Sequence, residues 1–142
     1  AGIEGYPKTS GSSGIHIYIP MNAKYSYEEV KDFGHLLMQM VNKKLPDLTT
    51  LERSLQKRDK HKIYLDYLQN RRGQTLASVY SLRPKNGAPV SMPLEWPEIK
   101  IGLKPTDFNI YNSLERLKEK GDLFKPVLGK GIDMLKVINR LS

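Results

Sequence analysis

The sequence contains no cysteine, three histidines and one tryptophan among its 142 residues. Without cysteine the chain has no disulfide framework, no thiol nucleophile and no thiolate metal site, which fits a reducing compartment. No apolar run approaches the ~18 residues that a membrane-spanning helix needs. A Walker A loop, a nucleophile elbow and a zinc knuckle are also absent. We therefore expect no membrane partner and a cytoplasmic location.

Acidic side chains are outnumbered by basic ones. Lys and Arg total 23 against 15 Asp and Glu, which gives a net charge of +8 and a pI near 9.6. Such an excess favours a polyanionic partner, because each phosphate that a protein neutralises releases condensed counterions. A generic basic protein would carry the same charge, so charge alone leaves both interpretations open.

The first half of the chain predicts a strand followed by a helix. In residues 15–19, isoleucines alternate with His16 and Tyr18, as expected for a strand with two different faces. Ser26 and Glu29 form a capping box, which predicts a helix that runs to about Lys44.

The second half adds more strands and helices. Apolar residues at 63–68 and 76–82 predict the two strands of a hairpin. Residues 113–120, with Asn112 and Gly121 as caps, and residues 132–141 predict two further helices. We expect residues 1–142 to form one α+β domain, with a mixed or antiparallel sheet and flanking helices.

A carboxylate, Asp66, falls inside the apolar segment 63–68. An acid there costs free energy unless it is paired or binds a cation, so metal ligation is one interpretation and an edge-strand Asp facing solvent is the other. Divalent sites for phosphoryl transfer usually need two or more acids, so Asp66 alone makes no such site.

A turn of glycine and serine, Ser10–Gly14, precedes the predicted strand and is here called the Gly/Ser turn. Successive backbone N–H groups and small hydroxyls in such a turn can hold an anion, which would give His16 a ligand-binding role. His16 could equally be a structural strand residue. Arg83, which closes the segment 76–82, is either a fork for phosphate oxygens or a surface arginine.

Five other basic residues form a solvated face that can contact a nucleic-acid backbone. They are Lys57, Arg58, Lys60, Arg71 and Arg72.

Three segments carry a resemblance that covers nearly the whole chain in order. They are KTSGSSGIHIYIP, KIYLDYLQNRRGQTLASVYSLRPKNGAPVSMPLEW and GLKPTDFNIYNSLERLKEKGDLF. Together they resemble the archaeo-eukaryotic primase superfamily, and more narrowly the polymerase domain of bacterial ligase D. The resemblance implies the RRM-like half of a primase-polymerase catalytic core.

The resemblance also implies roles for six residues. Asp66 matches the family's third metal-binding aspartate, a catalytic residue that would hold Mn²⁺ or Mg²⁺. The nucleotide-binding positions that match are Ser10, Ser13, His16, Gln69 and Arg83. Relatives often carry Lys or Arg where this chain has Ser13, so phosphate binding there would depend more on backbone and hydroxyl donors.

The implied activity is template-directed nucleotidyl transfer that fills gaps at DNA ends in non-homologous end joining, as part of an ATP-dependent ligase D. The implied partners are DNA ends, NTP or dNTP, Ku and a fused ligase domain, in the nucleoid-associated cytoplasm of a bacterium. A preference for ribonucleotides and manganese is implied as well. A non-catalytic nucleotide- or DNA-binding module is the alternative, and a degenerate domain with a structural role is a third.

One family motif does not occur in the sequence. An Asp-x-Asp that supplies the other two metal-binding carboxylates should lie upstream of Lys8, where only seven residues with one acid, Glu4, are present. We therefore expect the chain to be the C-terminal portion of a polymerase domain and to be inactive by itself.

Overall fold

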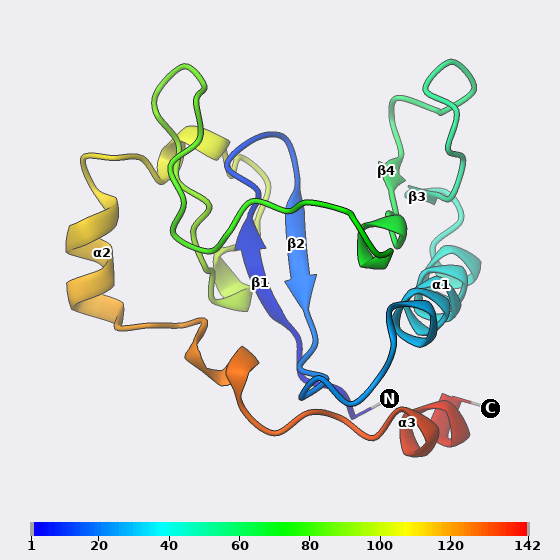
Figure 1. Ribbon diagram of the computed structural model, residues 1–142. Helices are drawn as coiled ribbons and strands as arrows, with labels where there is room; N and C mark the ends of the chain where they lie inside the picture. Colours follow the sequence, from blue (N-terminus) through cyan, green and yellow to red (C-terminus); the bar gives the residue numbers. More distant parts are fainter. Residues whose placement is uncertain (1, 142) are drawn as a thin grey trace. The chain divides into compact units, whose positions relative to one another are not determined.

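The computed structural model describes residues 2–141, which fold into two compact units. Ala1–Lys24 and Ala77–Ser142 form the first, here the hairpin unit, and Tyr25–Leu76 form the second, here the helix unit (Figure 1). With three α-helices and two two-stranded sheets among the described residues, the fold is α+β, as predicted. The elements are, in order, β1 (Tyr6–Thr9), β2 (Ile15–Tyr18), α1 (Tyr27–Lys44), β3 (Thr49–Thr50), β4 (Ile63–Tyr64), η1 (Leu68–Asn70), η2 (Trp96–Glu98), η3 (Pro105–Asp107), α2 (Ser113–Lys120), η4 (Lys125–Leu128) and α3 (Met134–Leu141).

The hairpin unit is built around β1, which lies beside β2 in Figure 1. The two strands pair antiparallel, with Thr9 opposite Ile15. Residues 90–94 follow the other edge of β1, where the Thr9 N–H donates to Met92 O at 2.8 Å. The Gly/Ser turn therefore starts from a strand that is bonded on both edges. The buried apolar side chains of this unit are Val90, Met92, Leu94, Met134 and Val137.

The predicted alternation of β2 is confirmed, but its isoleucine face is the open one. Ile15 is 40% and Ile17 is 54% exposed, while His16 and Tyr18 are half-buried. Tyr18 packs edge-on against Phe124, with ring centroids 4.8 Å apart. The face that carries His16 is therefore the one covered by the rest of the hairpin unit.

The helix unit begins with the predicted capping box. Ser26 Oγ accepts from the Glu29 N–H at 3.3 Å, and Glu29 Oε2 accepts from the Ser26 N–H at 2.7 Å. The helix α1 then runs to Lys44 and buries Phe33. After it, β3 and β4 form a short parallel pair, which places the chain for the turn that contains Asp66.

The predicted hairpin of segments 63–68 and 76–82 is wrong. Only the first two residues of the earlier segment form a strand, and they pair with β3. The later segment runs antiparallel to residues 89–91, where the Arg83 N–H donates to Pro89 O at 2.8 Å. Alternation marks a segment as extended but does not identify the segment that pairs with it, which is why the prediction failed.

The two later helices lie close to their predicted ranges. The chain leaves α2 at Gly121, whose φ of +69° confirms the predicted C-cap. Asn112 does not cap the helix through its side chain; its Oδ1 accepts instead from the Asn109 N–H at 2.9 Å. Within residues 2–141, none of the helices combines the length and the apolar character that a bilayer-spanning segment requires.

Candidate nucleotide site and metal ligand

The Gly/Ser turn is closed by the hydroxyl of its first residue. Ser10 Oγ accepts from the N–H groups of Ser12 and Gly14, both at 3.1 Å, and the Ser10 N–H donates to Gly14 O at 2.8 Å. Gly11 adopts a φ of +64°, which glycine tolerates without strain. Ser10 is buried and organises the turn, whereas Ser13 is exposed and can meet a ligand.

Arg83 lies against this turn, although 73 positions separate the two in the sequence. Its Nη1 donates to Ser10 O at 2.7 Å. A Cβ added to Gly11 would lie 2.5 Å from Arg83 Cγ, so the glycine allows the arginine to approach. Two predicted nucleotide-binding residues, Ser10 and Arg83, are thus brought together by the fold.

His16 follows the turn on β2 and belongs to the same hairpin. Its cross-strand partner is Lys8, and both residues lie on the covered face of the hairpin. Neighbours directly opposite in an antiparallel pair point to the same side. Ser10, His16 and Arg83 are therefore held around one end of the hairpin.

A hollow of about 200 Å³ opens beside the Gly/Ser turn. Ser12 and Ser13 line it from the turn, and Lys100 and Lys104 line it from the loop between η2 and η3. Two lysines and two hydroxyl residues form a suitable lining for phosphate oxygens. Neither lysine could be predicted as a ligand residue from the sequence, because no local pattern connects this loop to the turn.

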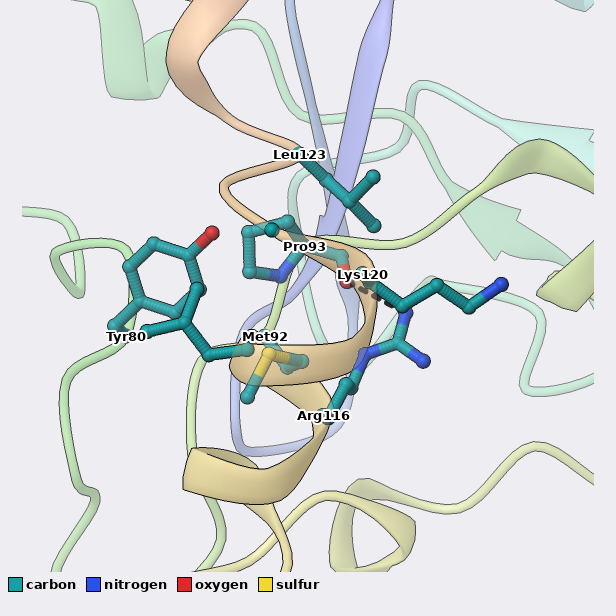
Figure 2. Close-up of a pocket in the computed structure, with 8 residues that line it drawn as sticks. Tyr80, Met92, Pro93, Arg116, Lys120 and Leu123 are labelled. Carbon is teal, nitrogen blue, oxygen red and sulfur yellow. Dashed lines mark hydrogen bonds between the residues drawn. The ribbon is translucent and has the colours of Figure 1, made fainter.

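A second hollow, in the same unit, is lined by a charged residue whose hydrogen bonds go to the protein itself. Figure 2 shows Tyr80, Met92, Pro93 and Arg116 around it. Arg116 Nη2 donates to Pro93 O at 3.2 Å and to Glu98 Oε2 at 2.6 Å, so the guanidinium bonds to the protein itself. We assign no ligand to this hollow.

Asp66 lies in a turn between β4 and η1, and not inside a strand as predicted. Its Oδ1 accepts from the Leu68 N–H at 2.9 Å, and its Oδ2 accepts from Gln69 Nε2 at 3.3 Å. The carboxylate is exposed, so its remaining lone pairs can reach a cation. Gln69, predicted to lie near the nucleotide, orients this carboxylate.

The turn around Asp66 packs on one face of α1. His35 stacks on Tyr67, with ring centroids 4.2 Å apart and an interplanar angle of 15°. A Cβ added to Gly34 would lie 3.2 Å from Asn70 Nδ2, and the same amide donates to Tyr67 O at 3.0 Å. The helix thereby fixes the residue that follows the carboxylate.

The acidic residues around Asp66 do not form a complete metal site. Among residues 2–141, no group of three or more His, Asp or Glu side chains is placed to share an ion. Mn²⁺ and Mg²⁺ take carboxylate oxygens as ligands, so the Asp66 carboxylate can serve as one ligand of such an ion.

The five predicted DNA-contacting residues lie in the helix unit and divide into two kinds. Arg58 stacks over the Tyr64 ring at 3.6 Å, and its Nε donates to Glu52 O at 3.0 Å, so this side chain supports its own loop. The other four are exposed: Lys57, Lys60, Arg71 and Arg72.

Comparisons with known proteins agree on one family. The model of the family described as "LigD, primase-polymerase domain" matches residues 1–124. The chain is similar to the bifunctional non-homologous end joining protein LigD of Bacillus subtilis, with 39% identity over 121 residues, which are 84% of this chain and 20% of that protein. The multifunctional non-homologous end joining protein LigD of Pseudomonas aeruginosa is 31% identical over 118 residues, covering 83% of this chain and 14% of that protein.

A solved structure extends the similarity to three dimensions. The polymerase domain of Mycobacterium tuberculosis ligase D, in complex with DNA, matches with a TM-score of 0.82 and 26% identity over 92% of this chain and 45% of that one. The chain thus spans a fifth or less of these two curated relatives and under half of the solved domain. Because the family model covers most of the sequence and the fold agrees, this chain belongs to the LigD primase-polymerase domain family.

Proposed function

We propose that the chain forms part of a template-directed nucleotidyltransferase that fills gaps at DNA ends in non-homologous end joining. The observation that carries this proposal is the hydrogen bond between Arg83 and Ser10, which brings together two predicted nucleotide-binding residues from distant segments. The names of the relatives support it with a polymerase domain and with non-homologous end joining.

The hairpin unit binds the nucleotide in this proposal. The triphosphate lies against the Gly/Ser turn, where Arg83 neutralises phosphate charge and Ser13 donates from its hydroxyl. His16 contacts the sugar or the adjoining phosphate. Lys100 and Lys104 line the hollow beside the turn and supply positive charge next to Ser13, which is uncharged.

The helix unit supplies a metal ligand. Asp66 holds one Mn²⁺ or Mg²⁺ ion together with carboxylates from outside residues 2–141, and Gln69 keeps the Asp66 carboxylate oriented. When bound, such an ion acts as a Lewis acid that neutralises phosphate charge and favours ionisation of a primer hydroxyl. On this account residues 1–142 act as the C-terminal portion of one polymerase domain.

The exposed basic residues of the helix unit contact DNA. Lys57, Lys60, Arg71 and Arg72 are suited to the phosphate backbone, which positions a duplex without reading its sequence. The similar solved domain was observed with DNA, and the similar curated proteins act in end joining. We therefore propose DNA ends, NTP or dNTP, Ku and a ligase domain as partners, at the bacterial nucleoid.

Primer extension on a gapped duplex tests the proposal. A polypeptide that carries residues 1–142 together with the family's Asp-x-Asp carboxylates, here called the full-length polypeptide, is given manganese and ribonucleotides. Its wild type is compared with Asp66→Asn and Asp59→Asn. Asp59 is a matched control, because it too is exposed and accepts a backbone N–H two residues on, from His61 at 2.9 Å. We expect Asp66→Asn to reduce extension to background and Asp59→Asn to leave it unchanged. Extension by Asp66→Asn at the wild-type rate would contradict the metal role.

A non-catalytic nucleotide- or DNA-binding module is the second candidate. It is favoured by one observation, the lack of a three-ligand metal cluster within residues 2–141. This candidate predicts nucleotide binding without extension in the full-length polypeptide. The same assay separates the two, because only the polymerase incorporates nucleotides.

A further inference from the structure

We propose that Lys8 is a positioning residue for nucleotide binding: a fully buried ammonium that joins the Gly/Ser turn to the segment carrying Arg83 and adds positive potential behind the phosphate site. This inference rests on the proposed function of the turn. Lys8 belongs to β1, has 0% exposure and cannot itself touch a bound nucleotide. It has to act through its neighbours and through its charge.

The neighbours of Lys8 meet at one buried serine. Lys8 Nζ donates to Ser91 Oγ at 2.5 Å and to Ala77 O at 2.9 Å. The Ser91 hydroxyl in turn donates to Thr9 O at 2.7 Å. Thr9 is the residue immediately before Ser10, so the ammonium is connected to the first residue of the turn through a single side chain.

The backbone of Ser91 connects the same point to the segment that carries Arg83. The Ser91 N–H donates to Ser81 O at 2.9 Å, and the Tyr80 N–H donates to Ser91 O at 2.8 Å. Tyr80 has a φ of +61°, an uncommon conformation for an aromatic residue, and these bonds hold it there. Ser91 thus fixes the turn and the Arg83 segment relative to each other, and Lys8 occupies one lone pair of its hydroxyl.

Lys8 also lies directly beside a predicted ligand residue. It is the cross-strand partner of His16, and its ammonium lies 5.7 Å from the centre of the Tyr18 ring. That distance allows a cation–π attraction, which offsets part of the desolvation of the charge. Ser10 is thus two residues from Lys8 along the chain, His16 is opposite it, and the charge of Arg83 is close enough to repel that of Lys8.

The charge of Lys8 has no acidic counterpart. Among the described residues, no carboxylate lies within ion-pair distance of its ammonium. The titratable or charged groups on the segments in contact with it are His16 and Tyr18 on β2 and Tyr80 and Arg83 on the 77–83 segment. Burial, followed by repulsion from Arg83, lowers the pKa of Lys8 to about 8.

A buried cation without a carboxylate partner is costly to keep and gains stability when an anion arrives. A triphosphate on the Gly/Ser turn supplies that anion and raises the pKa of Lys8 in the complex. Nucleotide binding then takes up protons near pH 8, and affinity falls as the pH rises above 8. A lysine that serves only to fill space predicts neither effect.

The test compares nucleotide binding by three forms of the full-length polypeptide. ATP affinity is measured without divalent metal for the wild type, Lys8→Met and Lys118→Met, with the thermal midpoint measured in parallel. Methionine keeps an unbranched side chain that lacks only the position of the ammonium, and it removes the charge. Lys118 is an exposed lysine on α2, so Lys118→Met removes the same charge elsewhere. We expect Lys8→Met to weaken ATP binding about tenfold at pH 7 and Lys118→Met to change it less than about twofold.

The pH profile adds a readout that a structural role would not move. Wild-type affinity should decline between pH 7 and pH 9 (about one unit on either side of the Lys8 pKa), and Lys8→Met should flatten that decline. If Lys8→Met fails to fold, calorimetry of the wild type at pH 8 in two buffers of different ionisation enthalpy replaces it, and proton uptake on ATP binding is expected. Wild-type affinity for ATP in a folded Lys8→Met, or no proton uptake, overturns the role of Lys8. Arg83→Ala shows whether only the role of Lys8 is wrong or the proposed nucleotide site is wrong too. If Arg83→Ala leaves ATP binding unaffected, the nucleotide site is refuted as well.

Discussion

In the hairpin unit, the Gly/Ser turn is closed by local bonds to Ser10, but the side-chain hydrogen bonds that anchor the turn and β1 to residues 77–92 join positions 69 to 83 apart. In the helix unit, Asp66 is held by residues two and three positions away. The turn depends on buried partners such as Lys8 and Ser91, and Asp66 is exposed. The proposed phosphate site is therefore built by the tertiary fold, while the proposed metal ligand is presented by a local turn supported on α1.

This difference suggests that nucleotide binding and the metal-dependent reaction depend on different units of the chain. A turn fixed by long-range contacts needs no metal to exist, so it can bind phosphate before any ion is present. A single exposed carboxylate binds a divalent ion well only with further ligands. We expect changes in the hairpin unit to alter nucleotide affinity and changes around Asp66 to alter the metal dependence of the reaction.

The largest effect is expected from Arg83→Ala. It removes a charged donor from the phosphate site and a hydrogen bond from Ser10 O, so nucleotide affinity should fall about 30- to 100-fold. Isothermal titration with ATP measures it, and the exposed Arg72→Ala serves as the control for charge. A loss of less than about threefold would contradict the contact.

Gly11→Ala should affect both stability and binding. The φ of +64° is strained for alanine, and the new Cβ would lie 2.5 Å from Arg83 Cγ, so we expect a loss of about 2 kcal/mol in the free energy of unfolding together with weaker ATP binding. Gly14→Ala is the matched control, because its Cβ would meet no atom within 4 Å. Denaturant titration distinguishes them, and equal stabilities of the two variants would show that the turn is not constrained at Gly11.

Gln69→Ala tests the helix unit, where we expect an effect on metal dependence and not on nucleotide affinity. Without its amide, Asp66 Oδ2 loses an orienting donor at 3.3 Å, so the manganese concentration for half-maximal extension should rise about tenfold, with ATP affinity in the absence of metal unchanged. Gln74→Ala, in an exposed turn of the same unit, provides the control. If Gln69→Ala weakened metal-free ATP binding instead, Gln69 would be a nucleotide contact.

The smallest effect is expected from Ser26→Ala. It removes one half of the capping box of α1 and should cost about 1 kcal/mol of stability, while Ser26→Asp, which can still cap, should cost less. Urea titration followed by circular dichroism checks both variants. ATP affinity should stay at the wild-type value, because the cap belongs to the helix unit; a change in affinity would contradict the separation of roles.

Local chemistry explains what could be predicted from the sequence. The capping box at Ser26 and the end of α2 at Gly121 involve residues only a few positions apart, so their patterns sufficed. The roles of Ser10 and Arg83 came from a family resemblance, because no spacing rule links residues 73 positions apart. The α+β class followed from the same local patterns.

The missed features all depend on tertiary contacts. The false hairpin of 63–68 with 76–82 arose because an extended segment does not specify its partner. The sequence predicts no role for Lys8, because a single lysine before a glycine-rich turn is a common feature. Its complete burial, which only the fold shows, distinguishes it from other lysines. Lys100 became a candidate ligand residue only once the fold placed its loop beside the turn.

The most direct test of the central claim is ATP binding to the full-length polypeptide in EDTA, for the wild type, Arg83→Ala and Asp66→Asn. We expect the wild type and Asp66→Asn to bind ATP equally well and Arg83→Ala to bind it far more weakly. Metal-free binding that is absent in the wild type, or lost in Asp66→Asn but retained in Arg83→Ala, would contradict a phosphate site built by the hairpin unit.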